Sequence, residues 1–168
     1  MSGGSRDAAG AVDPALLRAA VATLAPALPL LRELGERFAA AGHELALVGG
    51  PVRDAFIGRT SPDLDFTTDA SPDATLAVIR GWADAHWEIG RAFGTIGLRK
   101  GDAQIEITTY RTDVYDRSTR KPLVAFGTSL ADDLVRRDFT VNAMALRLPS
   151  LEFVDLHGGL ADLAAGRL

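Results

Sequence analysis

The sequence predicts an α/β (α+β) fold, a mixed and mainly antiparallel sheet with helices packed on one face. The first observation is that helix-type spacing of apolar residues alternates with strand-type runs along residues 13–168. The second is the order of these segments: helix, strand, helix, strand, helix, three strands, helix and strand. The third is a composition of 47% hydrophobic and 24% charged residues in a chain of 168, which suits a single globular domain.

The first half of the chain is expected to alternate helices with strands. Residues 1–12 are mostly Gly, Ser and Ala with little to bury, so we expect them to be disordered. Apolar residues over 14–38 recur at spacings of three and four, which predicts two helices, or one helix broken at its prolines. The apolar run 44–50 predicts a buried strand. The helix expected over 51–58 begins with Pro, whose missing N–H costs nothing in a first turn.

The second half is expected to be richer in strands. Residues 63–69 alternate as a strand, and Ser71 is the expected N-cap of a helix that runs to about Ala85. Residues 112–128 are polar and without periodicity, which predicts a long loop. The remaining expected elements are strands over 86–91, 93–100 and 103–111, a helix from Ser129 to about Arg137, strands over 141–148 and 151–156, and a short helix over 158–166.

Charge and composition exclude several classes of protein. The net charge of -4 argues against a nucleic-acid-binding surface over the whole molecule, so any contact with a polyanion must be local. The basic residues are 16 Arg and two Lys, which reflects either phosphate binding or a bias in composition. The absence of Cys excludes disulfides and thiolate metal sites. The longest weakly polar run, residues 19–31, is too short to cross a bilayer and is not a secretory signal, so we expect a cytoplasmic protein.

The strongest local signal is the segment LVGGPVRD, in which Gly49 and Gly50 lie between the end of a strand and the start of a helix. Backbone N–H groups at such a junction can approach an anion closely, and Arg53, one turn further, can bind the same phosphate with two N–H groups. These residues therefore predict a phosphate-binding turn. The alternative is a tight turn that needs glycine only for its backbone freedom.

Three carboxylates form the next candidate site. Asp63 and Asp65 are two residues apart on one strand, so both point to the same face and repel each other unless a cation lies between them. Glu106 lies between two isoleucines expected to face the core, so it must point to the opposite face. Such oxygen ligands suit Mg²⁺, which takes substrate phosphates as further ligands. The alternative is that all three face solvent; Asp102 and Asp113 are weaker candidates for the third carboxylate.

A polar cluster surrounds Phe139, and its members are Arg136, Arg137, Asp138 and Asn142. These side chains could hold phosphate and ribose hydroxyls, or the arginines could simply stabilise the C-terminal end of a helix. The expected loop before them could follow a nucleic-acid backbone and stack a base, or could be solvated. Its candidate RNA-contacting residues are Arg111, Tyr115, Arg117, Arg120 and Lys121.

The histidines and tryptophans are expected to be structural. The three histidines have no metal-ligand spacing, and Ser, His and Asp form no nucleophile elbow. We therefore expect structural or surface roles for His43, His86 and His157, and core positions for Trp82, Trp87 and Phe93.

Four segments together resemble a known family. They are LVGGPVRDAFIG, SPDLDFTTDASPD, IEITTYRTDVYDRSTRKP and DDLVRRDFTVNAMAL, in this order. They resemble the head domain of class II tRNA nucleotidyltransferases, the CCA-adding enzymes, and of the related bacterial poly(A) polymerases, which have the DNA polymerase β-like nucleotidyltransferase fold. The resemblance covers about residues 45–168.

The resemblance implies transfer of nucleotides to RNA by two metal ions. Asp63 and Asp65 would hold two Mg²⁺ ions, and Glu106 would complete the acidic set. The substrates would be CTP, ATP and the 3′ end of tRNA, whose hydroxyl attacks the α-phosphate with release of pyrophosphate. The triphosphate and ribose would be bound by Gly49, Gly50, Arg53, Arg137, Asp138 and Asn142.

The resemblance also bears on domain organisation. Residues 13–168 correspond to the head alone, so the neck, body and tail domains, including the part that reads the base, are expected to lie outside this sequence. Two other functions stay open: poly(A) addition to RNA 3′ ends by the same head, and binding of nucleotide or RNA without turnover. The intact Asp63, Asp65 and Glu106 argue against the second.

Overall fold

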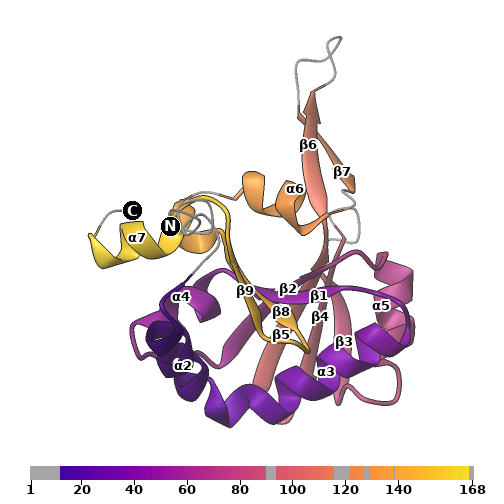
Figure 1. The fold of residues 1–168 in the computed structure, drawn as a ribbon. Coiled ribbons are helices and arrows are strands. Elements are labelled where there is room, and N and C mark those ends of the chain that lie inside the picture. The colour runs from indigo at the N-terminus through magenta and orange to yellow at the C-terminus, as the bar shows by residue number, and fades with distance from the viewer. Residues whose placement is uncertain (1–11, 90–93, 116–121, 127–128, 138, 167–168) are drawn as a thin grey trace.

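The computed structural model describes residues 12–89, 94–115, 122–126, 129–137 and 139–166. They form a seven-stranded sheet in the order β3-β4-β5-β2-β1-β8-β9 and a separate two-stranded hairpin, β6-β7, that projects from it (Figure 1). The strands are β1 (Leu45–Val48), β2 (Asp63–Thr68), β3 (Ala85–Ile89), β4 (Thr95–Lys100), β5 (Ala103–Thr109), β6 (Arg111–Tyr115), β7 (Pro122–Phe126), β8 (Met144–Leu148) and β9 (Glu152–Asp155). The helices are α2 (Pro14–Thr23), η1 (Ala25–Ala27), α3 (Leu28–Ala40), α4 (Gly50–Phe56), α5 (Pro72–Ile79), α6 (Leu130–Val135), η3 (Thr140–Asn142) and α7 (Gly159–Ala164).

The sheet is mixed and mainly antiparallel, so the expected fold class is confirmed. Among its described strands, β2 and β5 form the one parallel pair, and the other five neighbouring pairs are antiparallel. Helices α5 and α6 begin at the serines that the sequence predicts as their N-caps. Ser71 accepts a hydrogen bond from the N–H of Ala74 at 3.1 Å, and Ser129 accepts one from Asp132 at 3.1 Å.

The main core lies between the sheet and the helices α2 to α5. Leu45 and Leu47 of β1 point into this core, and the intervening Ala46 and Val48 point to the other face of the sheet. There they pack in a smaller cluster with Leu134 of α6. The short helix α6 is thus an exception to the expected placement of helices on one face, and Figure 1 shows it above the sheet. It covers this face near β1 and β8. Further along the same face, Glu106 of β5 and Trp87 of β3 are exposed, and this part is called the accessible face below.

Three elements differ from their expected limits. Helix α5 ends at Ile79 rather than near Ala85, because Arg80 is extended and Gly81 takes a positive φ of 80°. The loop expected over 112–128 contains β6 and β7, which pair with each other and are too short for a clear periodicity. The strand expected from residue 141 begins only at Met144, since η3 comes first.

The two tryptophans have different environments. Trp82 is buried, as expected, and its indole N–H donates to Glu33 at 2.9 Å. The expectation that Trp87 lies in the core is wrong, because it belongs to the edge strand β3 and is 39% exposed. Phe93 lies outside the described residues.

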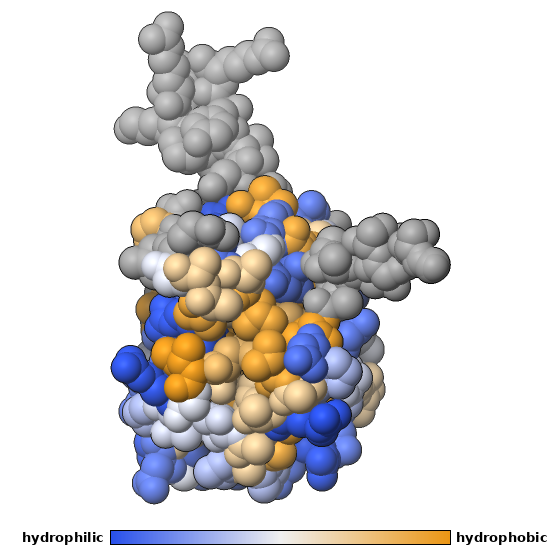
Figure 2. Space-filling view, turned by 60° about the vertical axis from the view of Figure 1, so that its left-hand side comes forward, coloured by the Kyte–Doolittle hydropathy of each residue, from blue (hydrophilic) through white to orange (hydrophobic). Residues whose placement is uncertain are grey.

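Hydrophobic side chains also gather on the outer surface, across the middle of the face drawn in Figure 2. Exposed large hydrophobic side chains of the described chain include Leu16, Ile57 and Leu156. None of the described helices is by itself long and apolar enough to cross a membrane. The helices at residues 14–23 and 25–40, which are bent by 60° relative to each other, meet the criteria of length and composition only as a pair.

Candidate active site

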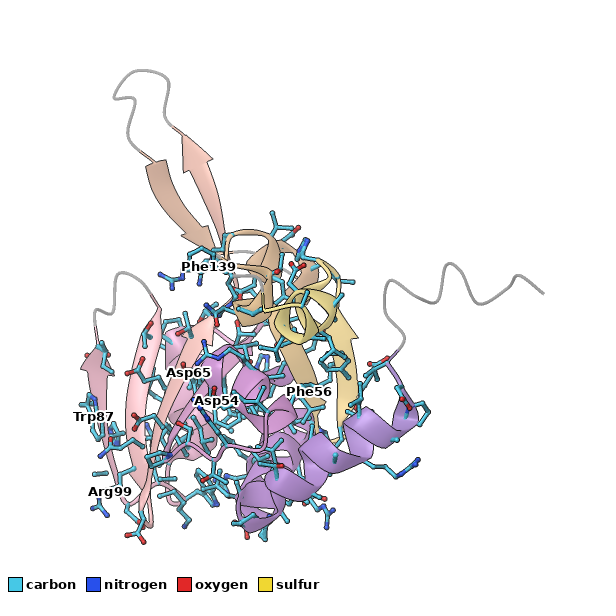
Figure 3. All side chains as sticks on the ribbon, turned by 90° about the vertical axis from the view of Figure 1, so that its left-hand side faces the viewer. Asp54, Phe56, Asp65, Trp87, Arg99 and Phe139 are labelled. Carbon is cyan, nitrogen blue, oxygen red and sulfur yellow. The ribbon has the colours of Figure 1, made fainter. Side chains whose placement is uncertain are left out.

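Strand β2 presents two carboxylates on the accessible face of the sheet. Asp63 and Asp65 are exposed, and Leu64 between them is buried in the core. This alternation follows from the pleat of the strand and agrees with the sequence-based expectation. Figure 3 labels Asp65 near the middle of the molecule.

The third carboxylate lies on the neighbouring strand. Glu106 of β5 is directly opposite Asp65 in the parallel β2-β5 register. Ile105 and Ile107 on either side are both 1% exposed, so Glu106 points to the same face as Asp65. Parallel pairing of β2 with β5, whose opposite residues are 41 positions apart in sequence, thus places Glu106 beside the two aspartates.

The protein raises the pKa of two of these carboxyl groups. At Asp65 desolvation is the largest cause, the nearby Arg137 guanidinium lowers the pKa in part, and the charge of Asp63 raises it further. At Glu106 desolvation is again the largest cause of the raised pKa, followed by the charges of Asp65 and Asp63. At both Asp65 and Glu106, desolvation and the neighbouring carboxylates therefore disfavour the charged form, and a nearby positive charge would favour it.

The glycine pair lies beside these acids. Gly49 has a φ of +73°, a conformation that favours glycine, and a Cβ placed there would be 3.9 Å from Oδ2 of Asp65. A Cβ placed on Gly50 would be 3.3 Å from Nη2 of Arg53, so the Arg53 side chain folds back over the turn. A bulky side chain at either position would crowd the space between the turn and the carboxylate.

Arg53 joins the turn to the distant polar cluster. Its Nη1 donates to Oδ1 of Asn142 at 2.9 Å, and its Nε donates to Asp54 at 3.1 Å. Asn142 lies on η3 and is 89 residues away in sequence. Two partners fix the orientation of the guanidinium, so an anion that bound to it would cost little additional side-chain entropy.

A buried acid that sequence reasoning missed holds the arginine cluster. Asp133 of α6 is fully buried, and its Oδ2 accepts a hydrogen bond from Nε of Arg137 at 3.1 Å and pairs with Nη2 at 3.0 Å. Its Oδ1 accepts from the backbone N–H of Arg111 at 3.0 Å and lies 3.5 Å from Nε of Arg136. The sequence signal was the spacing of three and four residues from Asp133 to the two arginines.

The remaining predicted residues divide into two groups. Arg111 and Tyr115 are the first and last residues of β6, and Arg111 reaches the cluster through its backbone. The predicted residues that lie outside the described part of the chain are Arg117, Arg120, Lys121 and Asp138.

The histidines agree with the structural or surface roles expected for them. His43 and Asp69 are joined by a hydrogen bond of 3.2 Å, and His86 and His157 are exposed. Within the described ranges, no three His, Asp or Glu side chains are grouped closely enough to hold one metal ion among them.

Comparison with known proteins identifies relatives of this chain. The family model of the poly A polymerase head domain matches residues 45–168. The CCA-adding enzyme of Bacillus pumilus (strain SAFR-032) is 38% identical over 143 residues, which cover 84% of this chain and 34% of that protein. The CCA-adding enzyme of Streptococcus pneumoniae serotype 19F (strain G54) is 44% identical over 138 residues, which cover 82% of this chain and 32% of that protein. The chain therefore spans about a third of the length of these curated relatives.

Solved structures share the fold. A CCA-adding enzyme in apo form II superposes with a TM-score of 0.73 at 30% identity, covering 94% of this chain and 36% of that one. The Bacillus stearothermophilus CCA-adding enzyme in complex with CTP superposes with a TM-score of 0.66 at 30% identity. The match covers 84% of this chain and 32% of that one. A tRNA nucleotidyltransferase with a primer tRNA and an incoming ATP analog superposes with a TM-score of 0.59 at 32% identity. The match covers 78% of this chain and 36% of that one.

These likenesses define the class: the fold is that of the DNA polymerase β-like nucleotidyltransferases, as the sequence resemblance implies. The match over residues 45–168 then gives the family. The chain belongs to the poly A polymerase head domain family.

Proposed function

We propose that this chain, over residues 13–168, is the head domain of a template-independent RNA nucleotidyltransferase. It transfers CMP and AMP from CTP and ATP to the 3′ end of tRNA in the cytoplasm. The observation that carries the proposal is the position of Asp65, which lies opposite Glu106 and next to the glycine turn. The names of the curated relatives support the choice of substrates, as do the neighbours solved with CTP and with a primer tRNA and an ATP analog.

The donor set fits Mg²⁺. This ion prefers oxygen ligands and is commonly held by one or two carboxylates, with phosphates and water completing its shell. Asp63 and Asp65 provide two carboxylates on one face, and desolvation, followed by the charge of Asp63, raises the pKa of Asp65 although Arg137 lowers it in part. We propose that these two residues hold two Mg²⁺ ions, which would supply positive charge to the phosphates and the attacking hydroxyl.

The proposed reaction is a displacement at the α-phosphate of the incoming nucleotide. A bond forms between O3′ of the tRNA and the α-phosphorus, the bond from that phosphorus to the bridging oxygen of the β-phosphate breaks, and pyrophosphate leaves. The proton of the hydroxyl passes to water. Arg53 and Arg137 bind the phosphates, Asn142 contacts the ribose, and Asp138 is proposed as a further nucleotide contact from the family resemblance alone.

The full natural protein, incubated with tRNA that lacks its last three nucleotides, separates this function from its alternatives. We expect CMP and then AMP to be added when CTP and ATP are both present, with extension ending after CCA. Long tails made from ATP alone would instead assign the chain to poly(A) addition. Tight nucleotide binding without any incorporation would assign it to a binding module.

Replacing Arg53 by Ala is expected to weaken the binding of CTP and ATP to the same extent. Loss of hydrogen bonds to a charged phosphate should raise both dissociation constants by about 10- to 100-fold. A phosphate contact carries no information about the base, so the ratio of the two constants should not change. Titration of each nucleotide into the Arg53→Ala protein measures this.

The exposed Arg59, which lies just beyond α4, offers a matched control, since Arg59→Ala removes the same charge from outside the site. A loss in Arg53→Ala that is much larger for one nucleotide than for the other would show that Arg53 contacts the base and not the phosphates.

A further inference from the structure

The accessible half of the sheet carries an aromatic side chain that the proposed chemistry does not use. Trp87 of the edge strand β3 is 39% exposed, and Ile89, two residues further on the same face, is exposed as well. Figure 3 labels Trp87 at the edge of the sheet, on the opposite side of Asp65 from Phe56.

Gly97 determines where the Trp87 indole lies. A Cβ on Gly97 would be only 2.3 Å from the indole Nε1 and 2.7 Å from Cε2, so no other residue fits there without displacing the ring. Trp87 is on β3 and Gly97 is on the neighbouring β4. The indole therefore extends from β3 across β4 toward β5, the strand that carries Glu106.

Strand register puts this indole and the acids in one row. Trp87 is opposite Gly97, Gly97 is opposite Glu106, and Glu106 is opposite Asp65. Residues directly opposite each other in neighbouring strands point to the same face of a sheet. One hollow of about 450 Å³ is accordingly lined by the acids together with Trp87 and Ile89.

The two sides of Asp65 differ. The glycine turn, with Arg53 and Asn142, lies on the β1 side of Asp65, whereas Glu106 and Trp87 lie on the β5 side. In an in-line displacement the attacking oxygen and the leaving pyrophosphate are on opposite sides of the α-phosphate. If the triphosphate binds at the glycine turn, the nucleotide that carries the attacking hydroxyl comes to the Trp87 side.

We propose that Trp87 stacks against the base of the 3′-terminal nucleotide of the RNA acceptor. This inference rests on the proposed function. Aromatic stacking tolerates any base, because every base has a π-face, and this suits a site whose acceptor end changes from one addition to the next. Arg99, exposed on the same face of β4 and 3.9 Å from the carboxylate of Asp84, would add positive charge for phosphates of the acceptor strand.

The test compares two RNA minihelices that reproduce the tRNA acceptor end, one with a normal 3′-terminal cytidine and one with an abasic 3′-terminal nucleotide. We expect the full natural protein to bind the normal end about tenfold more tightly, since stacking of one base changes affinity by about 5- to 100-fold. Trp87→Ala should remove this difference, and Trp87→Phe should restore part of it. The affinity for CTP should stay unchanged in both variants.

His86→Ala is the matched control, because His86 is exposed on the same strand but points to the other face. Equal discrimination in wild type and Trp87→Ala, with normal nucleotide transfer, would overturn the stacking role and leave the proposed function intact. Weaker CTP binding in Trp87→Ala, with discrimination between the minihelices retained, would also overturn it. Failure of the wild-type protein to bind or extend either RNA would overturn both proposals.

Discussion

Asp65→Asn is expected to lower the rate of nucleotide transfer by about 10³-fold, because several kcal/mol of transition-state stabilisation depend on its charge. Asp63→Asn should have an effect of the same order. Both residues are exposed at the accessible face, so the core is not disturbed. The measurement is single-turnover transfer of labelled CMP to tRNA, with circular dichroism and thermal unfolding to show that the fold is retained.

The matched control for this pair is Asp102→Asn. Asp102 lies exposed in the turn between β4 and β5 and is one of the two weaker sequence-based candidates for the third carboxylate. It should transfer CMP at the wild-type rate. Transfer by Asp63→Asn and Asp65→Asn within a few-fold of wild type would show that these carboxylates do not serve the reaction.

Asp133→Ala is expected to cause the largest loss of stability among single changes near the site. Removal of one member of a buried ion pair costs about 3–5 kcal/mol, because the remaining charge is left buried without its partner. Here the Asp133 carboxylate pairs with the side chains of Arg136 and Arg137 and accepts a hydrogen bond from the backbone N–H of Arg111. Urea denaturation of the variant should show this loss directly.

Because Arg137 would also lose its fixed orientation, nucleotide affinity should fall in Asp133→Ala even at temperatures where the variant is fully folded. The neighbouring Asp132→Asn is the control, since Asp132 is exposed in the first turn of α6 and its charge should contribute less than about 1 kcal/mol. Equal stability of the Asp133 and Asp132 variants would contradict the role given to the buried acid.

The local parts of the site could be predicted from the sequence. Alternation along β2 predicts that Asp63 and Asp65 share a face, and alternation along β5 predicts that Glu106 points away from the core; each is a property of one strand alone. The position of Glu106 directly opposite Asp65 depends on the pairing of the two strands. The glycine turn could also be predicted from the sequence, because a glycine pair followed by a helix that begins with proline is a local pattern. Such patterns place side chains within one element.

Contacts between elements that are far apart in the sequence could not be predicted from local sequence patterns. The pairing of Arg53 with Asn142 depends on how α4 and η3 pack together, and the burial of Asp133 depends on how α6 packs against the sheet. Trp87 was expected in the core because tryptophan is usually well buried. Its exposure follows from the position of β3 at the edge of the sheet, which is set by the strand order.

The most direct test of the central claim, that Asp63 and Asp65 hold the divalent ions beside the nucleotide, is a titration of Mn²⁺ followed by electron paramagnetic resonance in the presence of CTP. Mn²⁺ replaces Mg²⁺ at oxygen sites and gives a signal that is lost on binding. We predict bound Mn²⁺ in the wild-type protein and at least a tenfold weaker affinity in the Asp63→Asn/Asp65→Asn double variant. An unchanged Mn²⁺ affinity in the double variant would contradict the account.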